Sequence, residues 1–354
     1  MKTGRRLLLL ILPVLLVLSG CNKGKTKIVL YTGLGRQEVF RIENTSCSLP
    51  ELMVYLTNTG CRYEKVYGER IWQTSLEGVT LEDNIKEMVL AQISQIKAMT
   101  LLAQKEQVEL TKEEEEKVRK TAEVYYSGLN QKEIEVMGVS EETIRQLYRD
   151  YALANKVYYY IIKDINPEVS DDEARTITVD HILIKTYTLD EEGNRQEFSE
   201  SRKQEAFSRA LEVKKMLDEG QDFSRLAELY NEDGQTQYSF RKGQMNAELE
   251  ETAFNLGKGE ISDVVETEYG YHIIKCITTF NQEETDANKI QIVEEKRKEV
   301  FDERYSAFAL DLAKAMNTTL WEKVELIHDE EVDTTDFFEI YEEHFGTNSF
   351  SQWI

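Results

Sequence analysis

The stretch Ile177-Thr178-Val179-Asp180-His181-Ile182-Leu183-Ile184 is the clearest structural signal in the central part of this 354-residue chain. β-Branched and other apolar residues dominate it, which is typical of a buried β-strand. His181 places an ionisable ring inside that strand, and a buried polar group without a partner costs a few kcal/mol. The strand therefore predicts that His181 has a polar partner elsewhere in the chain.

A second stretch of the same kind follows about ninety residues later, at Tyr269-Gly270-Tyr271-His272-Ile273-Ile274-Lys275. We expect the two strands to lie side by side, because their histidines can then satisfy each other. Between them the chain runs through helical segments and then Arg241-Lys242-Gly243-Gln244-Met245.

This order of motifs resembles the parvulin family of peptidyl-prolyl isomerases, over residues 176–279. The resemblance implies an α+β protein that carries an FKBP-like module, with an antiparallel or mixed four-stranded sheet flanked by helices. It also implies cis/trans isomerisation of X-Pro bonds. That reaction makes and breaks no bond, so we expect neither a metal nor a cofactor.

The resemblance implies two groups of site residues. The catalytic group comprises the paired core histidines and the position where parvulins carry a Cys or Asp facing the substrate amide: His181, His272 and Asp233. The substrate-binding group comprises three pocket-wall positions and a threonine expected to join the histidine network: Met245, Leu249, Phe254 and Thr267.

The chain departs from the parvulin pattern at two places. Leu249 stands where the family usually has Phe, which shrinks the aromatic wall of the proline pocket. Only six residues separate Asp233 from Phe240, where parvulins usually carry a longer Gly-Gly-x-Leu-Gly segment. Both departures favour an alternative, a chaperone with a degenerate isomerase module. The loop at 188–195 is net acidic and would repel a phosphate, so we expect no dependence on substrate phosphorylation.

Other chemistries remain open at the same residues. The paired histidines could serve only to hold the sheet together, and the pocket-wall residues could be ordinary core. A metal site from His181, His272 and Asp233 lacks further ligands at sensible spacing. Cys276 and His272 could suggest a thiol nucleophile, but four strand residues separate them by about 13 Å. We expect Cys276 to belong to the core.

The N-terminus has the form of a processing signal. Basic residues precede an apolar run, Leu7 to Leu18, that is too short to span a bilayer comfortably. Leu18-Ser19-Gly20-Cys21 is similar to a bacterial lipobox and implies cleavage before Cys21 and lipidation of its thiol. Stable anchoring takes more than one acyl chain. We expect an extracytoplasmic protein, lipid-anchored to the bacterial cell membrane; an ordinary secretory signal is the alternative.

Charge and cysteine content constrain the partners and the covalent framework. The formal net charge of −23 argues against nucleic-acid binding. Cys47, Cys61 and Cys276 remain after Cys21, and an odd number cannot pair completely within one chain. Cys47 and Cys61 flank a predicted helix, Leu49 to Asn58, which would hold them about 15 Å apart, beyond disulfide reach. We expect free, mostly buried thiols.

Residues 37–165 are predicted to be mainly helical. Four residues have the form of helix N-caps, each ahead of an apolar periodic stretch: Ser48, Thr80, Thr111 and Ser140. Asn166-Pro167 then breaks the helical pattern. We expect a helical domain at 22–170, an isomerase domain at 176–279 and a C-terminal segment at 287–354.

The C-terminal segment is predicted to contain a long amphipathic helix, Ala287 to Met316, a strand at Trp321 to Ile327 and a short helix at Asp336 to Phe345. This arrangement resembles extracytoplasmic foldases of the PrsA and SurA type, in which the two ends of the chain pack into a chaperone domain. The resemblance implies that the helix at 287–316 docks on residues 37–165. It also implies folding secreted proteins as partners, and we expect any homodimer to form through the helical domain. A solute-binding lipoprotein is a further alternative, but the chain lacks repeated α/β units.

Overall fold

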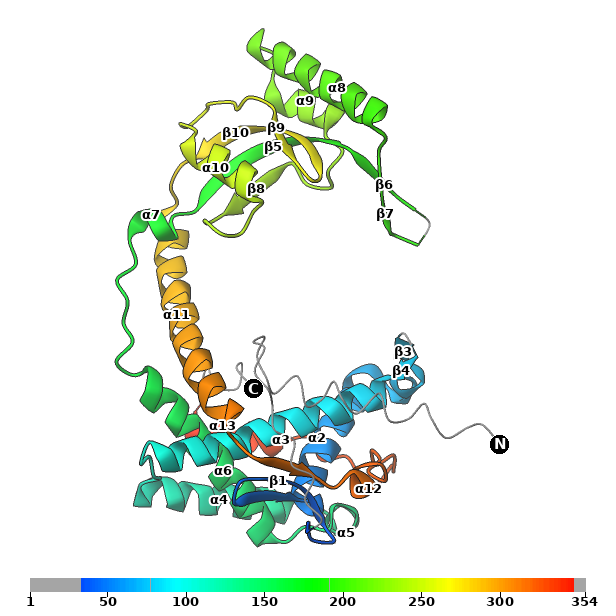
Figure 1. Ribbon diagram of the computed structural model, residues 1–354, viewed down its shortest axis with the longest axis vertical. Helices are drawn as coiled ribbons and strands as arrows, with labels where there is room; N and C mark the ends of the chain where they lie inside the picture. Colours follow the sequence, from blue (N-terminus) through cyan, green and yellow to red (C-terminus); the bar gives the residue numbers. More distant parts are fainter. Residues whose placement is uncertain (1–32, 77, 191, 347–354) are drawn as a thin grey trace. The chain divides into compact units, whose positions relative to one another are not determined.

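The computed structural model describes residues 33–76, 78–190 and 192–346 (Figure 1). The chain divides into two compact units. The first, here the helical unit, comprises Met1–Ile165 and Arg297–Ile354. The second, the sheet unit, comprises Asn166–Lys296. The signal segment and the lipobox with Cys21 lie outside the described residues.

Local capping signals set the helix starts of the helical unit. All four predicted N-caps are confirmed, and each side chain accepts a hydrogen bond from the backbone N–H three residues on. The helices begun in this way are α2 (Leu49–Tyr67), α3 (Leu81–Lys105), α4 (Lys112–Gly128) and α6 (Glu141–Ile162). Shorter elements complete this part: η2 (Glu69–Gln73), β3 (Ser75–Leu76), β4 (Val79–Thr80) and α5 (Gln131–Met137).

The C-terminal residues complete the core of the helical unit. Strand β11 (Lys314–Met316) pairs antiparallel with β1 (Glu38–Ile42), which also pairs with β2 (Thr45–Ser48). Helix α13 (Phe337–Phe345) brings Phe337 onto Tyr148, with ring centroids 4.3 Å apart. The two ends of the described chain therefore share one apolar core.

Two predictions for the C-terminal segment are wrong. The long helix, α11 (Gln282–Leu310), ends before residue 316, because the following residues pair with β1. In place of a strand at 321–327, the structure has α12 (Thr318–Trp321), which the side chain of Asn317 caps, and then irregular chain. The sheet unit takes in the first part of α11, through Lys296, and the rest of α11 belongs to the helical unit, on which the whole helix was expected to dock.

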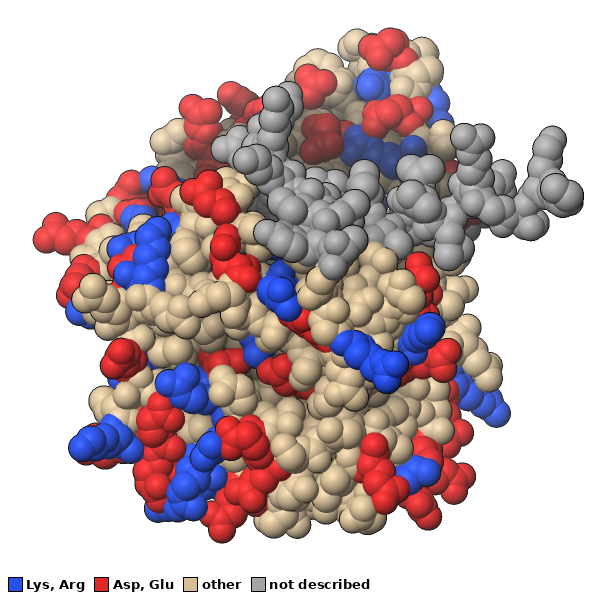
Figure 2. Space-filling model, turned by 60° about the horizontal axis from the view of Figure 1, so that its bottom comes forward, with Lys and Arg blue, Asp and Glu red and all other residues tan. Residues whose placement is uncertain are grey.

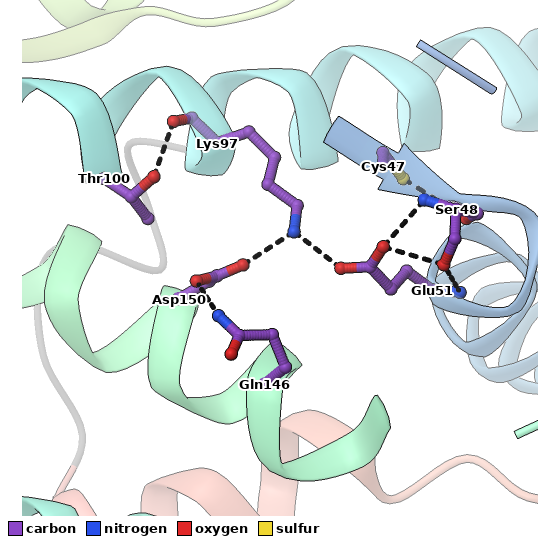
Figure 3. Close-up of polar contacts among 7 residues, drawn as sticks. All are labelled: Cys47, Ser48, Glu51, Lys97, Thr100, Gln146 and Asp150. Carbon is purple, nitrogen blue, oxygen red and sulfur yellow. Dashed lines mark hydrogen bonds and ion pairs between the residues drawn. The ribbon is translucent and has the colours of Figure 1, made fainter. Parts of the chain in front are cut away.

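A buried lysine links three elements of the helical unit (Figure 3). Lys97 of α3 lies 2.6 Å from Glu51 of α2 and 2.7 Å from Asp150 of α6, and only 4% of its side chain is exposed. Burial lowers the pKa of Lys97, but the carboxylates of Asp150 and Glu51 outweigh it and raise the pKa above its usual range. Lys97 is therefore charged inside the core.

The sheet unit contains a four-stranded antiparallel sheet, as the predicted fold class requires. Its strand order is β8 (Gln237–Phe240), β5 (Ile177–Lys185), β10 (Gly270–Thr278) and β9 (Val265–Thr267). Helices α8 (Glu200–Asp218) and α9 (Phe223–Tyr230) cover one face, and α10 (Ala247–Asn255) lies on the other (Figure 1). A short helix, α7 (Asp171–Ala174), precedes the sheet, and β6 (Tyr187–Leu189) and β7 (Arg195–Glu197) form a separate hairpin.

The surface carries both signs of charge. On the face drawn in Figure 2, acidic and basic side chains are interspersed, and no basic patch dominates. Among the described residues, none of the helices combines the length and the apolar character needed to cross a bilayer. Cys47, Cys61 and Cys276 are free, and Cys47 and Cys276 are buried.

Candidate active site

Strands β5 and β10 bring the two histidines together, which confirms the predicted strand pairing. His181 lies opposite Ile274 in the register, and His272 lies opposite Leu183, so the histidines are diagonal neighbours. Alternation along the strands puts both on the face that carries α10. His181 Nε2 and His272 Nδ1 are 2.7 Å apart, and the rings stack at 25° with centroids 5.0 Å apart.

Thr267 orients this pair. The backbone N–H of Tyr269 donates to Thr267 Oγ1 at 3.1 Å, and Thr267 Oγ1 lies 2.6 Å from His272 Nε2. If the hydroxyl donates to His272 Nε2, the proton of His272 sits on Nδ1 and is donated to His181 Nε2. The remaining proton of His181 then sits on Nδ1, facing the carboxylate of Asp233. The opposite order would point a nitrogen lone pair at an anion, so we assign the first.

Both histidines are neutral near pH 7. Burial lowers the pKa of His181 to about 4, against a smaller opposing effect of Asp233. Burial and the proximity of His181 lower the pKa of His272 to about 3. Two adjacent buried rings cannot both carry a charge, so the pair acts as a fixed set of dipoles.

Asp233 is held at the edge of the pair by the loop that follows α9. The side chain of Asn231 accepts from the backbone N–H groups of Leu183 and Asp233, and it donates to the carbonyl of Gln235. This clamp fixes the loop against β5. Asp233 Oδ2 lies 3.7 Å from His181 Nδ1, beyond hydrogen-bond length.

Asp233 is an anion that remains partly accessible. Burial raises the pKa of Asp233, but hydrogen bonds from Tyr238 and from the backbone of Gly234 outweigh it and lower the pKa below its usual value. Its side chain is 30% exposed, whereas that of His181 is 5% exposed. A substrate can therefore reach the carboxylate more readily than the histidines.

The predicted pocket-wall residues lie on the same face of the sheet as the histidines. Leu249 is 7% exposed in the apolar cluster formed by α10 and the sheet, and Met245 and Phe254 pack on that cluster half-buried. The ring of Phe254 contacts Phe240 edge-on at 5.9 Å. The guanidinium of Arg175 lies 4.9 Å from the centroid of the Phe254 ring. All seven predicted site residues thus come from the sheet unit.

The structure explains why residue 270, two positions before His272, is a glycine. Its φ of +138° lies in a region that side chains rarely adopt, and a Cβ there would lie 2.2 Å from the carbonyl oxygen of Ile184. A glycine is therefore needed for β10 to begin this close to β5.

Two polar residues of the site were missed in the sequence. Asn231 and Tyr238 both bind the Asp233 loop, and the Tyr238 hydroxyl donates to Asp233 Oδ2 at 2.5 Å. The only signal for Asn231 was its position just after the apolar face of α9. No signal indicated Tyr238, because its reach depends on how the shortened loop folds back.

Comparison with known families agrees with this geometry. Residues 181–278 match the family model of the rotamase, PPIC-type PPIase domain. The range contains both histidines, Asp233 and the pocket-wall residues. The sheet unit is therefore a parvulin-type peptidyl-prolyl isomerase domain.

The chain that carries this domain is similar to foldase proteins named PrsA. It is 32% identical over 216 residues to the foldase protein PrsA of Geobacillus kaustophilus, covering 58% of this chain and 65% of that protein. It is 27% identical over 252 residues to the PrsA of Caldanaerobacter subterraneus, covering 68% and 73% respectively. A crystal structure of PrsA from Bacillus cereus aligns with a TM-score of 0.39 at 20% identity, covering 76% of this chain and 97% of that one.

Proposed function

We propose that this chain is a membrane-anchored extracytoplasmic foldase that isomerises X-Pro bonds in secreted proteins without requiring phosphorylation. The observation that carries the proposal is the neutral His181–His272 pair beside the accessible Asp233 carboxylate, on the face that holds the pocket-wall residues. The matched rotamase domain supports it.

To catalyse the reaction, the site must bind the twisted amide of the transition state more tightly than the planar amide. Resonance opposes rotation about an X-Pro bond with a barrier of about 18–20 kcal/mol. A ten-thousandfold acceleration needs about 5.5 kcal/mol of preferential stabilisation of the transition state. A planar amide carries more negative charge on its oxygen than a twisted one. An anion at Asp233 beside that oxygen therefore destabilises the planar form more than the twisted form.

The apolar groups supply the binding energy. Met245, Leu249 and Phe254 would receive the proline ring, and the cation over Phe254, Arg175, would border it. The hairpin β6–β7 carries acidic residues, among them Asp190 and Glu192. These residues would repel a phosphate that approached the hairpin, which supports a substrate without one.

A second candidate is a chaperone that binds unfolded chains without isomerising them. Leu249 offers less aromatic surface than the usual Phe, and the Asp233 loop is short. The helical unit also exposes large apolar side chains, with Val66 at 66% and Tyr67 at 65% exposure. Such groups suit weak contacts with unfolded clients.

Refolding of a secreted protein limited by a proline step separates the two candidates. A foldase accelerates the slow phase at substoichiometric amounts, and Asp233→Ala abolishes the acceleration while aggregation of the client stays suppressed. A chaperone suppresses aggregation and leaves the slow phase unchanged in the wild-type chain. That second result would remove the enzymatic part of the proposal.

A further inference from the structure

Tyr238 occupies a special place beside the histidine pair. It lies in β8, the edge strand that the shortened loop after Asp233 leads into. Its ring meets that of His181 edge-on, with centroids 5.5 Å apart and an interplanar angle of 77°. Tyr238 is half-buried, so its ring covers the outer side of His181.

The hydroxyl of Tyr238 fixes the Asp233 carboxylate. It donates to Oδ2 at 2.5 Å, while the backbone N–H of Gly234 donates to Oδ1 at 2.8 Å. Both oxygens of the carboxylate are therefore held, one from β8 and one from the loop. The hydrogen bond to an anion is of the stronger, charge-assisted kind.

His181 is left without a partner on the same side. Its Nδ1 is buried and makes no hydrogen bond within the described residues, although Asp233 Oδ2 is only 3.7 Å away. A small rotation of the carboxylate would bring Oδ2 onto the Nδ1–H of His181. The Tyr238 hydroxyl competes for that same oxygen, and in the structure Oδ2 accepts from Tyr238 and not from His181.

We propose that Tyr238 is a positioning residue that holds the Asp233 carboxylate off His181 and keeps it available to the substrate amide. This inference rests on the proposed isomerase function for its catalytic consequence. Without the tyrosine hydroxyl, the Nδ1–H of neutral His181 would donate to Asp233 Oδ2, and that oxygen would turn away from the substrate. Lys185 acts on Asp233 only through its more distant charge.

The test is Tyr238→Phe in the full chain, which keeps the ring over His181 and removes only the hydroxyl. We expect ¹⁵N NMR titration to show the pKa of His181 raised by about one pH unit or more, the effect of a carboxylate within contact range. We expect kcat for a short X-Pro peptide to fall about tenfold, with KM changed less than twofold, because the pocket wall is intact. Tyr187→Phe, a tyrosine in β6 outside the site, is the matched control and should leave both values unchanged.

A Tyr238→Phe chain in which His181 titrates as in the wild type would overturn the inference. A merely structural role would lower thermal stability without moving that titration. If the wild-type chain shows no isomerase activity, the proposed function fails by itself, and the NMR titration still decides whether Tyr238 restrains Asp233.

Discussion

At the scale of single residues, a chain of hydrogen bonds determines which atoms of the site carry protons and which group carries a charge. Thr267 fixes the proton of His272, and His272 fixes that of His181. The two rings remain neutral because burial disfavours the imidazolium. The only charge facing a substrate from these groups is then the carboxylate of Asp233.

The neutral pair makes the sheet unit sensitive to acid. An unfolded histidine binds a proton below about pH 6.5, whereas folded His181 does so only below about pH 4. The unfolded chain therefore binds more protons in that window, and stability is lost as the pH falls through it. We expect each histidine of the pair to contribute a loss of at most about 1.4 kcal/mol for each pH unit.

Hydrogen exchange of the β5 and β10 amides measures this effect, because the two tryptophans among the described residues, Trp72 and Trp321, belong to the helical unit. The double variant His181→Asn, His272→Asn is the reference and should show a shallower pH dependence. An equal slope in wild type and variant would contradict the assignment of a neutral pair.

The Thr267 hydroxyl is expected to matter more for its hydrogen bond than for its volume. Thr267→Val removes the donor to Nε2 of the buried His272 and leaves that nitrogen unsatisfied, at a cost of about 1–3 kcal/mol. Thr267→Ser restores the hydroxyl and should recover most of the loss. Protection of the β10 amides measures both variants, and equal protection in the two would refute the role of the hydroxyl.

At the scale of elements, local signals could be read from the sequence and distant pairings could not. Ser48 and Thr111 cap helices through bonds to residues three positions on, so the predicted starts are confirmed. Residues 314–316 pair with β1, more than 270 residues earlier in the chain. The apolar periodicity of the preceding helix continues into these residues, and for that reason the sequence predicted a helix there. The contact between His181 and His272 was predictable, because each of two similar apolar strands carried an imidazole that needed a hydrogen-bond partner.

The buried Lys97 shows the same limit. It lies one helical turn after Ile93 on the apolar face of α3, where a lysine interrupts the periodic series of apolar residues. Its partners come from α2 and α6, so the sequence alone could not identify them. Removing one partner of such a buried network destabilises the fold strongly, because a buried charge is left uncompensated.

We expect Lys97→Met to destabilise the helical unit by about 3–5 kcal/mol, because it leaves Glu51 and Asp150 buried without their cation. Tryptophan fluorescence during urea unfolding follows this unit. Lys65→Met removes an exposed lysine of α2 and is the matched control, expected to change stability by less than about 0.5 kcal/mol. A loss for Lys97→Met as small as that of the control would contradict the role of the buried network.

At the scale of the whole molecule, the isomerase domain is an insertion in the helical unit. The chain leaves the helical unit after Ile165 and returns to it at Arg297, within α11. The C-terminal residues then join the N-terminal ones in one core. In the proposed foldase, the two ends of the described chain accordingly build one folded body, and the inserted domain carries the chemistry.

The proposed anchor makes a separate prediction. We expect the wild-type protein to partition into the detergent phase with a lipid-modified Cys21, and Cys21→Ala to lack the lipid. Mass spectrometry of the N-terminal peptide measures the modification. Cys61→Ala, a cysteine of α2, is the control and should be lipidated normally. An unmodified wild-type Cys21 would contradict the anchor.

The central claim is that this chain catalyses rotation about X-Pro bonds at Asp233 and the histidine pair. Exchange NMR on a short unphosphorylated X-Pro peptide, with and without the chain from residue 22 onward, tests it most directly. We expect accelerated cis/trans exchange that falls at least tenfold in Asp233→Ala and His272→Ala, with the fold of each variant checked by hydrogen exchange. A well-folded wild-type chain that leaves the exchange rate unchanged would contradict the claim.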